Sequence, residues 1–425
     1  MFENTTIAGD WLSREKLAGY DPATLSTRVV VVGAGAAGNN IVQTLALSGC
    51  TDIAIIDYDT IEPSNLTRSP LFRPERMQGS RRRFKAREVA LSAVEVSYAE
   101  DFKARYAIAP VEALGLGAFE GAGVVIAAVD SLSLRAFLAD ATRLLGIPLV
   151  EVGFLAPNGQ VSVFPNRTTG EPCWRCLHPE VQHGSASCAL YAEAAIAAGI
   201  APATQTVAAV FGSLAAEAAI MALHGEFPLG GKVLHLDIRT GKSTVLELVA
   251  DPQCPGGHRL LGEVQPLSVT TNDSAQLLLA AASGHGIADP VLRLPLPFMV
   301  EAPCVACGSR VSIQRPVWTL SSPPRCKACK TERSSEPVLP VITSRVARSD
   351  RIAQLQCKRL GLSSGAVFEI EDAATRKSQA FHLAGGPDDL FITKTRNARN
   401  NLAPQAITVS RDDEEFEPLV TVDPA

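Results

Sequence analysis

Polar and charged side chains crowd one short stretch of this 425-residue sequence. Asp57, Asp59, Glu62, Asn65 and Arg68 all lie within twelve consecutive positions. Carboxylates can bind ribose hydroxyls or a divalent cation, and an arginine can neutralise phosphate charge. A hydride-transfer site has little use for so many such groups. The stretch suits a nucleoside triphosphate that is bound together with a metal ion.

A glycine-rich turn precedes this stretch, with Gly33, Gly35 and Gly38 in the order Gly-Ala-Gly-Ala-Ala-Gly. The residues around the turn predict a strand, a helix and a second strand over residues 29–32, 39–48 and 53–56. Glycines let such a turn close and let the backbone approach a phosphate group, and the helix N-terminus offers free N–H groups. Asp57, at the tip of the second strand, could hold ribose hydroxyls. The turn alone is more typical of dehydrogenases that bind NAD or FAD, and the charged stretch after Asp57 reverses that preference.

The loop that begins at Asp57 resembles the adenylating enzymes of the ThiF/MoeB family, which activate ubiquitin, ubiquitin-like proteins and bacterial sulfur carriers. The family pattern is Asp-x-Asp-x-Val-Glu-x-Ser-Asn-Leu-x-Arg-Gln, and here Ile61 and Ser69 replace the valine and the final glutamine. The resemblance covers about residues 10–258. Further motifs follow in the family's order: Lys85-Ala86, Val129-Asp130-Ser131, Gly159-Gln160-Val161 and Cys173-Trp-Arg-Cys176.

The resemblance implies that ATP and Mg²⁺ bind at the glycine turn. The residues that would contact the nucleotide are Gly33, Gly35, Gly38, Asp57, Asp59, Asn65, Arg68, Lys85 and Asp130. Arg68 and Lys85 would neutralise phosphate charge, and Asp130 would bind magnesium. Arg14 would reach the ATP site of a neighbouring protomer, which implies a homodimer. From the residues alone, Asp130 could instead be a helix N-cap, and Arg14 a solvated surface arginine.

Cys188 matches a cysteine that, in the family, lies near the adenylate and accepts the activated acyl group or a sulfur. A thiolate attacks acyl-adenylates readily when nearby cations or a helix end lower its pKa. The alternative is a structural cysteine packed near a metal site.

Seven of the ten cysteines fall at metal-ligand spacings. Cys173, Cys176 and Cys254 match three of the family's four zinc cysteines, and Gly257 occupies the place of the fourth. His258 could supply a nitrogen instead and complete a Cys₃His zinc site, although it could also be a surface histidine. Two further pairs, eighteen residues apart, predict a second zinc site in a zinc ribbon: Cys304, Cys307, Cys326 and Cys329.

The composition is that of an ordinary globular protein, with 46% hydrophobic and 20% charged residues and a net charge of −5. This balance argues against a general nucleic-acid or membrane-surface binder. The N-terminus carries no visible secretory signal, so reduced cysteines and a cytoplasmic location are expected. The apolar residues 207–223 predict a buried core helix rather than a membrane span.

We expect an α/β fold with a Rossmann-like doubly wound sheet. The predicted units are an adenylation domain with structural zinc over residues 1–260, a linker and zinc ribbon over 261–335, and a small α+β module over 336–395. A partly disordered acidic tail over 396–425 would follow. Within the C-terminal units, the spacing predicts helices over residues 274–283 and 350–360.

The resemblance and the extra C-terminal units together favour an enzyme that activates a ubiquitin-like protein. It would adenylate the C-terminal carboxylate of that protein, take the acyl group as a thioester on Cys188, and pass it to a conjugating enzyme. A sulfur-carrier adenylyltransferase is the alternative within the family. An NAD-dependent oxidoreductase and a catalytically silent zinc scaffold are alternatives from other classes.

Overall fold

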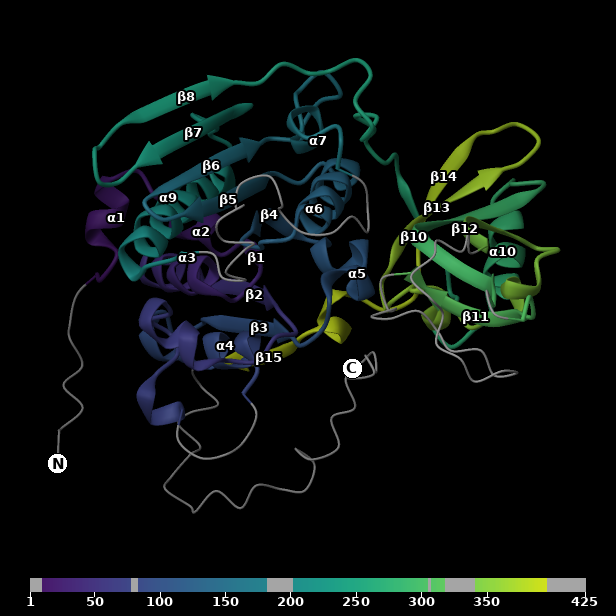
Figure 1. The fold of residues 1–425 in the computed structure, drawn as a ribbon, viewed down its shortest axis with the longest axis horizontal. Coiled ribbons are helices and arrows are strands. Elements are labelled where there is room, and N and C mark those ends of the chain that lie inside the picture. Colours follow the sequence, from purple (N-terminus) through teal and green to yellow (C-terminus); the bar gives the residue numbers. More distant parts are fainter. Residues whose placement is uncertain (1–9, 78–82, 182–201, 305–306, 318–340, 396–425) are drawn as a thin grey trace.

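The computed structural model describes residues 10–77, 83–181, 202–304, 307–317 and 341–395, which form two β-sheets with their helices (Figure 1). The larger sheet has nine strands in the order β15-β3-β2-β1-β4-β5-β6-β7-β8. Its central strands, all parallel, are β1 (Arg28–Val32), β2 (Asp52–Ile56), β3 (Lys103–Ala107), β4 (Ala122–Ala127) and β5 (Leu149–Leu155). This order of parallel strands is that of a Rossmann-like sheet, so the predicted α/β class is confirmed.

Antiparallel strands extend both edges of the parallel core. On one side the additions are β6 (Asn158–Phe164), β7 (Lys232–Asp237) and β8 (Ser243–Glu247). On the other side, β15 (Ile392–Thr395) pairs with β3 although it comes from near the end of the described chain. One sheet edge is therefore completed by residues far away in the sequence.

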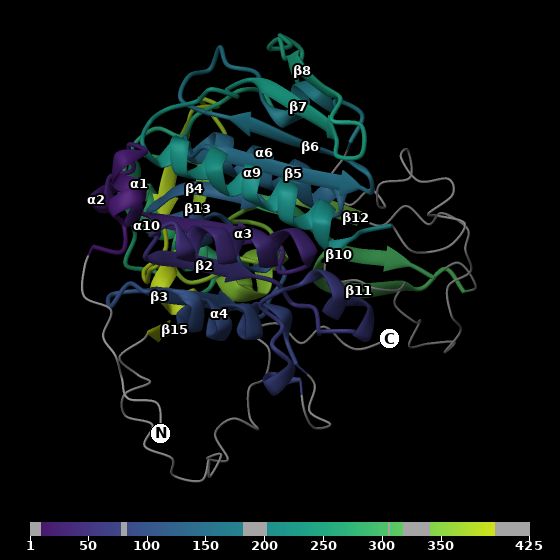
Figure 2. The ribbon, with the colours of Figure 1, turned by 90° about the vertical axis from the view of Figure 1, so that its left-hand side faces the viewer.

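Helices cover both faces of the larger sheet. One face carries α3 (Ala36–Leu47), α4 (Lys85–Val96) and α9 (Gln205–Leu223), which Figure 2 shows stacked over the strands. The other carries α5 (Val111–Leu114), the 3₁₀ turn η3 (Leu116–Phe119) and α6 (Leu132–Leu145). Alternate residues of β1 point to opposite faces, since Val29 and Val31 join one core and Val30 and Val32 the other. Strands buried on both faces explain the nearly continuous apolar runs.

Short elements surround this core. They are α1 (Ser13–Leu17), α2 (Pro22–Leu25), α7 (Trp174–Leu177), and the 3₁₀ turns η1 (Pro63–Arg68) and η2 (Pro74–Arg76). Among the described helices, α9 has the length and composition that could cross a membrane, yet half of that apolar window is buried in this fold. It packs against α3 and the sheet as a core helix, as predicted.

A smaller sheet with its own core follows residue 263. Its strands are β9 (Val264–Pro266), β10 (Pro290–Pro303), β11 (Arg310–Pro316), β12 (Val341–Ala347), β13 (Val367–Asp372) and β14 (Ser378–His382). The helix α10 (Ala275–Ser283), which the sequence predicted, packs on it. Strands from residues 261–335 and 336–395 pair within this one sheet, so the two predicted units share a core. The turn η8 (Pro387–Leu390) then leads back to β15.

The helix predicted over residues 350–360 is wrong. The chain there forms two 3₁₀ turns, η6 (Arg351–Gln354) and η7 (Cys357–Leu360), separated by extended backbone. The Leu355 carbonyl accepts from the Ala275 N–H at 3.0 Å, and the Cys357 N–H donates to Asp273 at 2.8 Å. Backbone groups that a helix would pair internally are therefore bound to the start of α10 instead.

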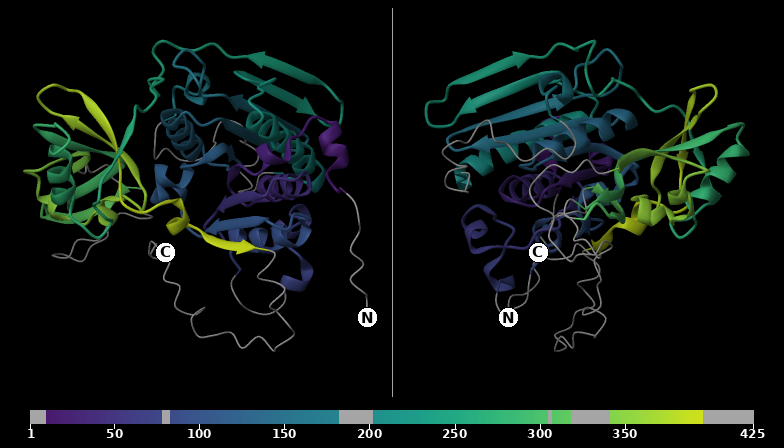
Figure 3. Two further views of the ribbon diagram at one scale, coloured as in Figure 1. Left: turned by 180° about the vertical axis from the view of Figure 1, so that it is seen from behind. Right: turned by 45° about the vertical axis from the view of Figure 1, so that its right-hand side comes forward.

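Figure 3 shows the smaller sheet beside the larger domain. Several ion pairs join the smaller sheet and its C-terminal extension to that domain, Arg259–Glu369 and Arg105–Asp388 among them. Arg259, which follows the last residue of the predicted zinc site, donates two hydrogen bonds to Glu369 of β13 at 2.7 and 2.9 Å. Arg105 on β3 pairs with Asp388 of η8 at 2.7 Å. Together with the pairing of β15 to β3, these contacts attach the two bodies at separate points.

We expect acid to weaken the smaller body through Glu371. This buried carboxylate accepts hydrogen bonds from Arg345 at 2.9 Å, Arg293 at 2.8 Å and Arg376 at 2.9 Å. The arginines lower the pKa of Glu371 from 4.5 to about 2. A lowered pKa adds stability that is present above the unfolded value and is lost as pH falls from about 4.5 to about 2. Urea titrations between pH 7 and pH 2 should show this loss in the wild-type chain.

The matched variants are Glu371→Gln and, as a control, Glu263→Gln at an exposed position. Glu371→Gln should lower the urea midpoint at pH 7, because it leaves the arginines without their charged partner. Below pH 3 the urea midpoints of the variant and the wild-type chain should lie closer together, because the wild-type carboxylate is then losing its charge. An equal deficit at every pH would contradict this role for Glu371.

Candidate nucleotide and metal sites

The glycine turn closes tightly between β1 and the end of β4. Gly33 has φ +97°, and a Cβ at that position would lie 2.3 Å from the Ala128 carbonyl oxygen. A Cβ at Gly38 would lie 1.9 Å from the Gly33 oxygen, so neither glycine can carry a side chain. At Gly35, by contrast, an added Cβ would meet nothing within 4 Å. Gly35 is the N-cap of α3 and provides no side-chain cap for the first N–H groups of the helix, which are the groups that bind phosphate at such turns.

Three of the predicted residues form a connected chain beside this turn. One carboxylate oxygen of Asp57 accepts from the Ala34 N–H and the other from the Asp59 N–H, both at 2.7 Å. The Asp59 carboxylate in turn pairs with the Lys85 ammonium at 2.8 Å. Burial raises the pKa of Asp57 from 3.8 to about 6, and the two backbone donors oppose part of that rise. The fold therefore brings Asp57, Asp59 and Lys85 to the same edge of the sheet.

Asp130 lies at that edge, exposed, just after β4. The pKa of Tyr58 is raised by partial burial and then by neighbouring negative charges, those of Asp59 and Asp130 among them. The N-cap of α6 is Ser131, whose hydroxyl accepts from the Leu134 N–H at 3.4 Å. The capping role that the sequence left open for Asp130 therefore belongs to its neighbour. An exposed carboxylate at a strand end, close to other acids, could bind a divalent cation.

The loop after β2 is shaped by its own side chains. The Asn65 amide oxygen accepts from the Glu62 N–H at 3.0 Å and caps η1. The Arg68 guanidinium, half-buried, donates to the Ser64 carbonyl within the same turn. Both predicted residues thus lie in the expected loop, where Asn65 holds the turn closed.

Two buried asparagine amides support the turn, a role that the sequence did not predict. Asn39 donates to the Ala34 carbonyl at 2.8 Å and accepts from the Leu71 N–H at 3.0 Å, so it ties the glycine turn to the chain beyond Arg68. Asn40, beside it, accepts from Gln205 of α9 at 2.9 Å. Two adjacent asparagines in the mostly apolar first half of the helix were the available signal, because buried amides must find partners.

Arg14 lies far from the glycine turn of its own chain. It belongs to α1, and the preceding Leu12 packs on Gly49, where a Cβ would lie 2.8 Å from a leucine methyl. Gly49 follows the C-terminal end of α3, whereas the glycine turn precedes its N-terminal end. At 1.5 Å per residue, a helix of 12 residues separates the two by about 18 Å. Arg14 is thus placed outside the site formed by its own chain.

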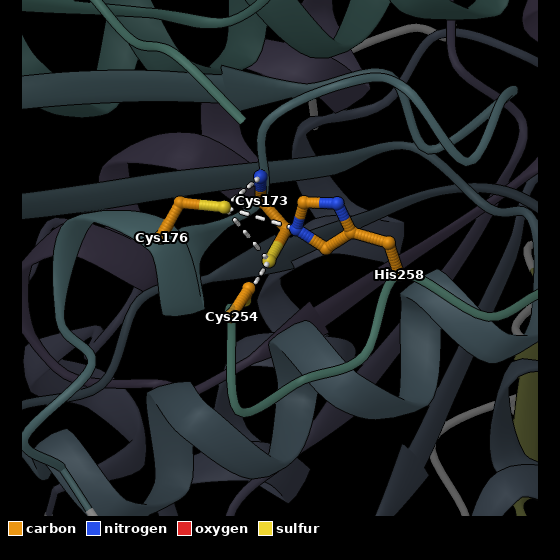
Figure 4. A group of neighbouring side chains, drawn as sticks. All are labelled: Cys173, Cys176, Cys254 and His258. Atoms are coloured by element: carbon orange, nitrogen blue, oxygen red, sulfur yellow. Dashed lines mark hydrogen bonds between the residues drawn. The ribbon is translucent and has the colours of Figure 1, made fainter. Parts of the chain in front are cut away.

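The predicted first zinc site is assembled as a compact cluster (Figure 4). The ligand atoms of Cys173, Cys176, Cys254 and His258 all lie within 4.8 Å of one another. The Cys173 sulfur is 3.8 Å from that of Cys176 and 3.5 Å from that of Cys254. Metal–sulfur bonds of about 2.3 Å in a tetrahedron require sulfurs to be roughly this far apart. The donor set fits a structural zinc ion.

Local backbone geometry brings His258 to the cysteines. Gly257 has φ +68° and His258 itself φ +46°, so the chain turns sharply after Cys254. The imidazole Nε2 lies 2.9 Å from the Cys176 sulfur. That sulfur also accepts from the Asp251 N–H at 3.4 Å. The histidine therefore lies where the predicted Cys₃His set requires it.

The second predicted zinc set is only partly described. Cys304 is buried at the end of β10, and Cys307 is exposed in the turn before β11. Their predicted partners Cys326 and Cys329 lie outside the described residues, as does Cys188. The zinc ribbon and the acyl-accepting cysteine stay predictions.

Comparisons with known proteins place these features in one family. The sequence profile of the ThiF family matches residues 20–256. The sulfur carrier protein adenylyltransferase of Thermus thermophilus is 34% identical over 236 residues, which are 53% of this chain and 80% of that protein. The molybdopterin-synthase adenylyltransferase of Salmonella typhimurium is 29% identical over 252 residues, 56% of this chain and 91% of that protein. The smaller sheet, which begins at Val264, lies beyond the profile match.

A solved structure is similar in fold. Escherichia coli MccB in complex with MccA-N7isoASN has a TM-score of 0.48 and 18% identity to this chain. The match covers 60% of this chain and 76% of MccB.

Proposed function

The chain belongs to the ThiF family, and we propose that it adenylates the C-terminal carboxylate of a small carrier protein with ATP and Mg²⁺. The observation that carries the proposal is the position of Asp57, Asp59, Lys85 and Asp130 at one edge of the sheet, beside a glycine turn whose helix has no side-chain cap. In open α/β sheets, ligands bind at this carboxyl edge.

Each of these residues has a part in the proposed reaction. The first N–H groups of α3 bind phosphate oxygens, and the Asp57 carboxylate accepts from ribose hydroxyls. Lys85 and Arg68 neutralise the phosphates, and Asp130 holds the Mg²⁺, which when bound adds positive charge beside the leaving pyrophosphate. The carrier carboxylate attacks the α-phosphorus, so an acyl-adenylate forms and pyrophosphate leaves. Positioning and electrostatic stabilisation supply the catalysis.

Sulfur-carrier adenylation is the better-supported substrate assignment. The extra C-terminal units favoured a ubiquitin-like conjugation system, but the relatives are named for sulfur carriers and molybdopterin synthase. We therefore place the sulfur carrier first. A homodimer in which Arg14 reaches the partner's nucleotide, a conjugating enzyme as recipient, and a cytoplasmic location belong to the proposal as well. The distance of Arg14 from its own glycine turn supports the homodimer.

The test is ATP–pyrophosphate exchange by the purified chain. Exchange should appear only when a carrier protein is added, and it should vanish when the last residues of the carrier are removed. A sulfur carrier and a ubiquitin-like protein from the same organism, tested in parallel, distinguish the two substrate assignments. No exchange with either carrier, together with binding of NAD in place of ATP, would overturn the proposal.

Cys188→Ser tests a second step, the transfer of the acyl group to the enzyme. In the wild-type chain we expect a carrier adduct on denaturing gels that disappears with reductant, because a thioester exchanges with thiols. The variant should still form acyl-adenylate but should lack this adduct. A reductant-sensitive adduct of equal amount in Cys188→Ser would assign the acceptor to another residue.

The pKa of Asp57, about 6, predicts that ATP affinity depends on pH. Ribose hydroxyls donate to the ionised carboxylate, and below about pH 6 the carboxyl holds a proton. ATP binding measured by calorimetry should therefore strengthen as pH rises from 5 to 7. Asp57→Asn should remove this part of the pH dependence, whereas titration of the ATP phosphates themselves would remain. An identical pH profile in the variant would exclude Asp57 as the cause.

A further inference from the structure

A buried ion pair lies behind the strand end that carries Asp130. Arg135, on α6, is 8% exposed and Glu151, on β5, is 1% exposed, and the guanidinium pairs with the carboxylate. Burying two charges costs desolvation energy, which the pair regains only with good geometry and further hydrogen bonds. The neighbouring contacts of this pair supply those hydrogen bonds.

The Arg135 guanidinium binds the backbone at the ends of two strands. One nitrogen donates to the carbonyl of Val129, the residue before Asp130, and also to the carbonyl of Val152 at 3.1 Å. On the other side of Asp130, the Ser131 hydroxyl begins α6 as its N-cap. The backbone of Asp130 is therefore held on both sides.

Residues around the ion pair keep the guanidinium in this orientation. The Glu151 carboxylate accepts from Ser162 at 3.2 Å and from Gln160 at 3.5 Å, both on β6. At Gly153, an added Cβ would lie 3.2 Å from the same arginine nitrogen. Residues of β5, β6 and α6 thus act together on the peptide that precedes Asp130.

We propose that Arg135 is a positioning residue for the metal site. With Glu151 it fixes the Val129–Asp130 peptide, and so it presents the Asp130 carboxylate to the magnesium ion of the bound nucleotide. This inference rests on the proposed function, in which Asp130 is the metal ligand. Residues that orient a ligand in this way commonly change metal affinity by 10–100-fold when they are mutated.

The test measures how much Mg²⁺ strengthens ATP binding, without any carrier protein. Calorimetry on the full chain gives the ATP affinity with Mg²⁺ and again with EDTA, and the ratio is the magnesium gain. We expect Arg135→Met to reduce this gain about tenfold while the affinity in EDTA changes by less than about twofold. Arg135→Lys keeps the charge but not the forked donor geometry, so it should retain an intermediate gain.

Arg143→Met is the matched control. Arg143 lies on the same helix, is 2% exposed, and donates to the carbonyls of Thr168 at 2.6 Å and Glu171 at 3.3 Å near the opposite end of α6. Its loss disturbs the fold in a similar way but leaves the Val129–Asp130 peptide intact. We expect the wild-type magnesium gain in this variant.

Two results would overturn the inference. One is a magnesium gain in Arg135→Met that equals that of the wild-type chain, and the other is a magnesium gain that falls as much in Arg143→Met as in Arg135→Met. Should Arg135→Met fail to fold, Gly153→Ala takes its place, because the added methyl crowds the guanidinium. It should lower the gain, and an unchanged gain would also overturn the inference. If the ATP affinity of the wild-type chain is the same with Mg²⁺ and with EDTA, that result would contradict the proposed function instead.

Discussion

Asp130→Ala is expected to lower carrier-dependent ATP–pyrophosphate exchange by at least about a hundredfold, because charge stabilisation of a phosphate transition state is commonly the largest catalytic contribution. Asp130 is exposed at the end of β4, so its removal leaves no cavity in the core. Asp130→Asn keeps the shape and removes the charge, and it should lose nearly as much activity. Exchange assays at saturating ATP and carrier, over a range of Mg²⁺ concentrations, measure the effect.

Asp101→Ala is the control for this experiment. Asp101 is also exposed, but it precedes β3 and lies at the opposite edge of the sheet from the glycine turn. This variant should exchange like the wild-type chain. Exchange by Asp130→Ala within tenfold of the wild-type rate would show that Asp130 is not the proposed metal ligand.

Cys254→Ser is expected to remove one zinc ion per chain and to destabilise the protein strongly. Loss of a bound metal is among the few single-residue changes that cost more than about 4 kcal/mol. At about 2–4 °C per kcal/mol for domains of this size, the melting temperature should fall by at least about 8 °C. Mass spectrometric metal analysis and thermal unfolding measure the two effects.

Two variants make this result specific. Cys50→Ser changes a fully buried cysteine outside the cluster and should retain all zinc. His258→Cys supplies the sulfur that the family pattern places one position earlier, at Gly257, and should keep zinc bound as a four-cysteine site. Full zinc content in Cys254→Ser, or a wild-type chain without zinc, would refute the assignment.

The cluster of Cys173, Cys176, Cys254 and His258 also bears on how the two sheets are attached. His258 contributes to the cluster, and the next residue, Arg259, pairs with Glu369 of the smaller sheet. One short segment therefore connects a metal site in the larger domain to an ion pair across the junction. We expect chelation of zinc to weaken the attachment of the smaller sheet as well as the local fold.

Local sequence determined the central features of this protein. The first strand, the glycine turn, the helix and the second strand could each be predicted from adjacent residues. The signals were an apolar run, the glycines from Gly33 to Gly38, a helical pattern, and a second apolar run that ends at Asp57. The same holds for the spacing of Cys173 and Cys176, since both ligands lie on one short turn. Glycine geometry and side-chain periodicity depend on immediate neighbours, so these features could be predicted without the fold.

Only the tertiary structure decided which distant residues meet. Arg135 pairs with Glu151, Asn39 accepts a hydrogen bond from Leu71 beyond Arg68, and β15 pairs with β3 although the two strands are far apart in the sequence. The interval 350–360 has helical spacing but forms two 3₁₀ turns, because α10 binds its backbone groups. The physical reason is that a pairing between remote residues depends on the complete packed fold. The spacing of residues along the chain does not predict which remote residues will pair.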